Sequence, residues 1–217
     1  MFKKMAIFIA VCGLFFVGCG EDNTPKENVK VGVVSTQTPL VIDEASKTIT
    51  VLAKVNGKYL DENTRHAVVF KGGKFGEKPV FISEANQNDF YKALIQIGGK
   101  PGNNMTPKNA AETQVEGDKI NISVTWDGAP KTYDINEVIS DSNGKPIDMR
   151  FGGNEANAMS FNTGCLACLD SCPVGIISNH TYTNGAVEKR NEVVFHGKKD
   201  VLPKDGTYVA ISFKLAQ

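Results

Sequence analysis

Apolar and polar residues alternate along much of the chain after about Val29, which is the pattern of half-buried β-strands. Two strands joined by a turn at residues 43–47 are predicted within residues 40–56. Further strands are predicted within residues 66–70, 79–83, 119–126, 131–139, 146–153, 192–197 and 207–215. In three segments the apolar residues that share one face are Ile49, Val51, Ala53 and Val55, then Ile120, Ile122, Val124 and Trp126, and finally Val209, Ile211, Phe213 and Leu215. These faces predict a sheet as the main element of the core.

One segment has helical spacing instead. Its apolar residues are Phe90, Ala93, Leu94 and Ile97, which recur every three or four positions. Asp89 is predicted as the N-cap, and Gly98 and Gly99 end the helix before Pro101. The sequence therefore predicts an α+β fold, in which one main helix packs on a mostly antiparallel β-sheet. We expect a single domain over residues 31–217 with one long cysteine-bearing loop.

Composition narrows the class of protein. The chain has 217 residues, of which 41% are hydrophobic and 22% charged, and its 21 glycines and 9 prolines favour a β-rich domain with many turns. Lys plus Arg and Asp plus Glu both number 24, so we expect no nucleic-acid partner. The sequence contains no G-x-S-x-G or H-E-x-x-H motif that would nominate a nucleophile or a base. An accessory or electron-transfer protein is favoured over an enzyme.

The N-terminus has the character of a targeting segment. Lys3 and Lys4 precede an apolar stretch that ends at Gly18, directly before Cys19. Residues 1–18 resemble a bacterial lipoprotein signal peptide, although Phe16 stands where such signals usually carry Leu. This resemblance implies that Cys19 is lipidated and anchors the protein to the lipid bilayer, on the extracytoplasmic side of the bacterial cell envelope. Residues 19–30 then form a flexible tether. An ordinary secretory signal with an incidental Cys19 is the alternative.

Three cysteines lie close together in the sequence, as Cys165-x2-Cys168-x3-Cys172. A C-x2-C turn aims two sulfurs at one point, and Cys168 and Cys172 share one side if their segment forms a helical turn. Converging thiolates are the ligands that a thiophilic metal or an iron–sulfur cluster requires. Asp170 and His180 are the candidate additional ligands, the latter for a Cys3His zinc or copper site. His66 and His196, far away in the sequence, are interpreted as structural or exposed.

The cysteine segment also resembles known proteins. "CLACLDSCP" is similar to the last three cysteines and the proline of the bacterial ferredoxin run, with Asn162 at the place of the missing first cysteine. The chain resembles the YdjY-domain family over roughly residues 60–215, through the segments "EKPVFIS", "ALIQIGGKPGNN", "GDKINISVTWDG", "MRFGGN" and "NTGCLACLDSCPVGIISNHTYTNG". This resemblance implies a ferredoxin-type protein, exported as a lipoprotein in some members, whose distinctive feature is the cysteine loop.

Three functions stay open at this point. The first is a membrane-anchored electron-transfer module that holds a 4Fe-4S cluster or another metal such as zinc and meets a redox partner in the envelope. The second is an exported binding or assembly module without a cofactor, whose loop is stabilised by a disulfide. The third is a thiol–disulfide oxidoreductase that uses Cys165 and Cys168, with Cys172 as the resolving thiol.

Overall fold

The structure is a computed structural model that describes residues 28–216. The predicted signal peptide, Cys19 and all but the last three residues of the predicted tether lie outside the described residues. No helix within residues 28–216 has both the length and the apolar character that crossing a bilayer requires.

The described chain is built mainly from short strands. The strands are β1 (Lys30–Val31), β2 (Val34–Ser35), β3 (Leu40–Asp43), β4 (Thr48–Val55), β5 (His66–Phe70), β6 (Phe81–Ser83), β7 (Ile120–Thr125), β8 (Tyr133–Asp134), β9 (Ile139–Asp141), β10 (Met149–Phe151), β11 (Cys165–Cys168), β12 (Ile177–Asn179), β13 (Phe195–Gly197) and β14 (Tyr208–Leu215). The helices are α1 (Gln87–Gln96), α2 (Ile135–Val138), α3 (Glu155–Ser160) and the 3-10 helix η1 (Gly57–Leu60).

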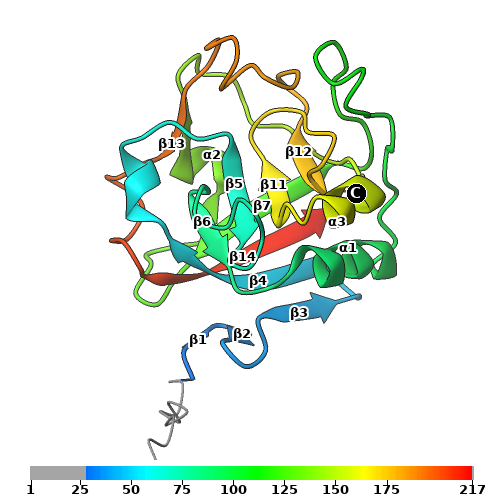
Figure 1. Cartoon of the computed structure of the whole chain (residues 1–217). Helices are drawn as coiled ribbons and strands as arrows, with labels where there is room; N and C mark the ends of the chain where they lie inside the picture. Colours follow the sequence, from blue (N-terminus) through cyan, green and yellow to red (C-terminus); the bar gives the residue numbers. More distant parts are fainter. Residues whose placement is uncertain (1–27, 217) are drawn as a thin grey trace, which may run out of the picture.

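One mixed sheet of ten strands carries the fold (Figure 1). Its order is β10-β12-β11-β5-β6-β4-β14-β7-β8, and β3 also pairs with β4. The pairs β5–β6 and β11–β12 are parallel, and the other pairs within this sheet are antiparallel. The strands β1 and β2, and β13 and β9, form two small antiparallel pairs beside it.

The alternating faces predicted from the sequence pack against α1. The side chains of Ile49, Val51, Ala53 and Val55 are buried, as are Val209, Ile211, Phe213 and Leu215. On α1, Phe90, Ala93 and Leu94 are buried as their helical spacing predicted, and so is Ile97, the C-cap that follows the helix. The rings of Phe90 and Phe213 meet edge to face with 4.7 Å between their centroids, which joins α1 to the sheet.

The predicted fold class is wrong. The protein is mostly β, with a curled mixed sheet and three short α-helices in its described part, not an α+β fold with one main helix on a mostly antiparallel sheet. One reason is local: the return strand predicted at 131–139 breaks into β8, α2 and β9. Asp134 and Glu137 form a capping box that starts a helical turn there. A second reason is that the cysteine segment contributes strands β11 and β12 to the sheet.

The N-cap of α1 also differs from the prediction. Asn86, not Asp89, caps the helix, and its Oδ1 accepts hydrogen bonds from the backbone N–H groups of Asn88 and Asp89 at 3.0 and 2.9 Å. Asp89 lies in the first turn, where its charge interacts favourably with the helix dipole. Both residues are typical of helix starts, so the sequence alone did not separate their roles.

Candidate metal centre

The cysteine segment begins as a buried strand, not as the predicted loop or helical turn. Strand β11 lies between β5 and β12, and its residues are fully buried. In a regular strand, Cys165 and Cys168 would point to opposite faces because side chains alternate. The register against β5 shifts between Cys165 and Ala167 and again between Ala167 and Cys168. Such an irregularity re-aims side chains, and here it turns both sulfurs toward one point.

His66 lies at that point. It begins β5 and is the cross-strand partner of Cys168. Its Nδ1 atom is 3.6 Å from Sγ of Cys165, and one ring nitrogen and the sulfurs of Cys165 and Cys168 all lie within 4.8 Å of one another. The thiol of Cys168 also interacts with that of Cys172, which is 2% exposed. Three potential ligands therefore converge in the interior, and Cys172 lies in the same buried cluster but outside that group.

The electrostatics of His66 suit a neutral metal ligand. Burial, together with the positive charges of Arg65 and Lys78, lowers the pKa of His66 to about 3. The imidazole is thus uncharged at any physiological pH and keeps a nitrogen lone pair available. The ring of Phe75 stacks on it with 5.2 Å between centroids, which holds the imidazole in place.

The thiols of Cys168 and Cys172 are protonated near neutral pH in the metal-free protein. Donation of its S–H to Cys165, together with burial, raises the pKa of Cys168 well above its ordinary value, and the hydrogen bond with Cys168 and burial do the same for Cys172. The positive charge of Arg65 favours the thiolate form of both residues, but it does not outweigh the effects that raise their pKa values. Reactive cysteines are exposed and have a lowered pKa, so these free, buried thiols lack the environment of a thiol–disulfide exchanger.

The two additional ligands proposed from the sequence have other contacts. Asp170 is fully buried and accepts hydrogen bonds from Nε and NH2 of Arg65, at 3.0 and 2.5 Å, and from the N–H of Gly185 at 2.9 Å. The Nδ1 atom of His180 lies 2.7 Å from the carbonyl oxygen of Val115. Neither belongs to the group around Cys165, so the structure offers His66 in their place.

Sequence reasoning missed His66 because 99 residues separate it from Cys165. No local motif marks it: the segment "HAVVF" carries only the signal of a strand. The pairing of β5 with β11 creates the site, and pairing over such a separation is not encoded in spacing along the chain.

A glycine-rich loop at residues 71–78 covers the cysteines, and we call it the cover loop. Its backbone N–H groups at Lys74 and Phe75 donate to the carbonyl oxygens of Asn162 and Thr163 at 2.8 and 3.3 Å. Gly73 packs directly against Gly164, so a Cβ atom on Gly73 would lie only 2.4 Å from the Cα atom of Gly164. This close approach lets the ring of Phe75 pack on the cysteine cluster.

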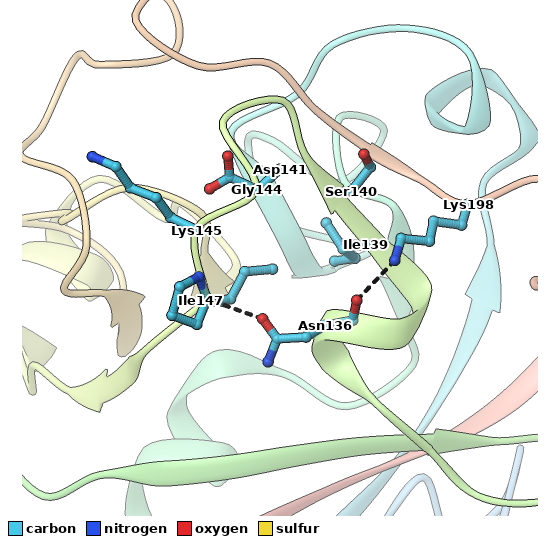
Figure 2. A pocket seen from close by; sticks show the side chains of 9 residues that line it. Asn136, Ile139, Ser140, Asp141, Gly144, Lys145, Ile147 and Lys198 are labelled. Carbon is cyan, nitrogen blue, oxygen red and sulfur yellow. Dashed lines mark hydrogen bonds between the residues drawn. The ribbon is translucent and has the colours of Figure 1, made fainter.

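A separate pocket of about 320 Å³ lies near α2 and β9 (Figure 2). Its polar groups bond to each other: the N–H of Ile147 donates to Oδ1 of Asn136 at 2.7 Å, and Nζ of Lys198 donates to the carbonyl oxygen of Asn136 at 2.9 Å. No cysteine or histidine lines this pocket. It is therefore independent of the cysteine group.

The cover loop gives a test of the packing over the site. Gly73→Ala should push the loop away from Gly164, cost about 1–3 kcal/mol of unfolding free energy and expose the thiols. Gly72→Ala is the matched control, because its Cβ would meet only the ring of Phe70, which can shift. The measurements are denaturant unfolding and the rate at which 4,4′-dithiodipyridine labels the cysteines. Equal labelling rates in the two variants would contradict a covering role.

The comparisons with known proteins agree with the resemblance seen in the sequence. The model of the YdjY domain matches residues 40–214. A protein of Escherichia coli (strain K12), described as "Uncharacterized protein YdjY", is 50% identical over 209 residues, which cover 96% of this chain and 92% of that protein. No solved structure matches the chain. With the matched region spanning the sheet, the cover loop and the cysteine segment alike, the chain belongs to the YdjY-domain family.

Proposed function

We propose that the protein is a metal-binding module that holds a single thiophilic metal ion through His66, Cys165 and Cys168, with Cys172 completing the set. The observation that carries this proposal is the spacing of the ligand atoms. Bond lengths of about 2.3 Å to sulfur and 2.0 Å to nitrogen place two ligands of a tetrahedral ion about 3.5–3.8 Å apart. The 3.6 Å between Nδ1 of His66 and Sγ of Cys165 fits that value.

The donor set also fits a soft or borderline ion. One neutral imidazole and two or three thiolates are the ligands of structural zinc sites, and they also suit copper(I) and iron. Hard cations such as Mg²⁺ prefer oxygen ligands, and Asp170, a buried carboxylate whose charge acts on Cys172, is already paired with Arg65. The ligands are fully or almost fully buried, so the site has the closed character of a centre without a substrate position.

An iron–sulfur cluster is the competing assignment for the same residues. The ligand atoms of His66, Cys165 and Cys168 lie within 4.8 Å of one another, which leaves room for one ion, and a four-iron cube would have to push them apart. The tight packing around them works against such an expansion: a Cβ atom on Gly175 would already lie 3.0 Å from Sγ of Cys168. The spacing therefore favours a mononuclear centre over the 4Fe-4S cluster.

We further propose that Cys19 carries acyl chains and holds this module at a membrane of the bacterial envelope. The signal-like residues 1–18 and the cysteine that follows them support the proposal.

Metal titration tests the proposed centre. We expect the reduced, metal-free protein to bind one Zn²⁺ or Co²⁺, and the cobalt form to show intense sulfur-to-metal charge-transfer absorption. His66→Ala should weaken the affinity at least about 100-fold because it removes a direct ligand. His180→Ala is the matched control and should leave the affinity unchanged, since its ring contacts Val115 instead. Iron with equimolar sulfide in protein purified without oxygen would contradict a mononuclear centre.

The pH dependence of that affinity follows from the shifted pKa values. Cys168 and Cys172 have pKa values raised well above the ordinary range, so each must release a proton when metal binds near neutral pH. His66, with its pKa lowered to about 3, releases none. The affinity should therefore rise about 100-fold or more per pH unit between about pH 6 and 8.

In Cys172→Ser this slope should fall by about one factor of ten per pH unit, because one ionising ligand is gone. An affinity that does not change with pH would contradict a site made of protonated thiols.

Membrane anchoring is tested in cells. The wild-type protein should fractionate with membranes and incorporate labelled palmitate, whereas Cys19→Ala should lose the label. Retention of the label in Cys19→Ala, or its loss in a Cys12→Ala control, would contradict lipidation at Cys19.

A further inference from the structure

Four lysines surround the outer side of the cover loop. Lys58, Lys71, Lys74 and Lys78 line one concavity of about 450 Å³, and we call them, with Phe75 between them, the lysine face. The Nζ atoms of Lys74 and Lys78 lie 5.8 and 5.5 Å from the centroid of the Phe75 ring. A partly exposed aromatic ring therefore sits among positive charges directly above the cysteines.

The charges of this face are only partly compensated. Lys58 pairs with Glu62, and Lys71 pairs with Glu84. The other two lysines of the face have no carboxylate partner within residues 28–216. Lys74 and Lys78 are exposed, so their charges are available to another molecule, although the exposed Glu77 lines the same concavity.

The face connects to the proposed metal centre through two contacts. Phe75 stacks on His66, and His66 lies 3.6 Å from the sulfur of Cys165. Lys78 is near enough for its charge to contribute to the lowered pKa of His66. A molecule bound on the lysine face would thus touch the ring that shields the ligand histidine.

We propose that the lysine face is the docking surface for an acidic protein that approaches the metal centre. That the partner approaches a metal centre rests on the proposed function, whereas the arrangement of the lysines around Phe75 does not depend on metal binding. Charge complementarity identifies the partner: four lysines around an aromatic ring, two of them without a carboxylate partner, match a surface rich in Asp and Glu, and they steer its encounter. Aromatic residues at the middle of a charged rim are also typical of protein interfaces.

A protein surface fits this face better than a small anion. Built anion sites use buried donors aimed at one point, whereas the lysines here are exposed and spread around the loop. Elsewhere on the molecule, the α2–β9 pocket is lined by two lysines, Lys145 and Lys198, and Lys198 donates to Asn136. The lysine face is the stronger candidate for that reason.

The experiment uses hexacyanochromate(III), a redox-inert paramagnetic trianion, and the full chain in detergent with its metal bound. We expect line broadening in NMR spectra to concentrate on residues 71–78 and on the Phe75 ring, and to weaken at high salt. Lys74→Glu with Lys78→Glu should reduce that broadening at least about tenfold. Lys92→Glu with Lys108→Glu, at two exposed lysines elsewhere, should leave it unchanged.

Two results would overturn the proposal. One is broadening spread evenly over all exposed lysines. The other is a saturable, tight site for inorganic phosphate in the concavity, which would make it a small-anion site. The metal content of each variant is measured in parallel. A protein that binds the anion at the lysine face but binds no metal would contradict the proposed function and leave the docking surface standing. A protein that binds metal but not the anion would contradict the docking surface and leave the proposed function standing.

Discussion

The irregular pairing of β11 with β5 is the constraint on which the rest of the site depends. Without the register shifts at Ala167, the alternation of a strand would send Cys165 and Cys168 to opposite faces of the sheet. With them, both sulfurs meet His66, the cross-strand partner of Cys168. Irregularities of this kind disrupt the hydrogen-bond ladder between strands and are common next to functional sites. Here the irregularity brings the candidate ligands together.

Burial gives this convergence its chemical meaning. A lone buried cysteine behaves as a small hydrophobic residue and indicates nothing about function. Cys168 and Cys172, with raised pKa values, lie beside an imidazole whose pKa is lowered to about 3, and this is a different environment, because these groups are uncharged near neutral pH and the two thiols would become thiolates on binding a metal ion. Arg65, held by Asp170, already favours the thiolate forms of Cys168 and Cys172 and would balance part of that negative charge.

Much of the sheet was predictable from the sequence, and the site was predictable only in part. Strands β4, β7 and β14 and helix α1 follow from their periodicity, since each buries one face. The mixed topology does not, because parallel pairs such as β5–β6 depend on contacts between distant segments. The cysteine spacing located three sulfurs but led to Asp170 and His180, the nearest carboxylate and the nearest histidine along the chain, while the fold brought His66 from far away.

That separation gives a bound metal ion a structural consequence. The ion would join β5 to β11, and β11 is followed in the sheet by β12 and β10 alone. These three short strands, of three or four residues each, offer few ladder hydrogen bonds to hold that end of the sheet. Ligands drawn from both sides of the β5–β11 pair would cross-link it, so part of the metal-binding free energy becomes folding free energy of this region. A bound ion would then both determine the chemistry of the site and stabilise the end of the sheet that carries its ligands.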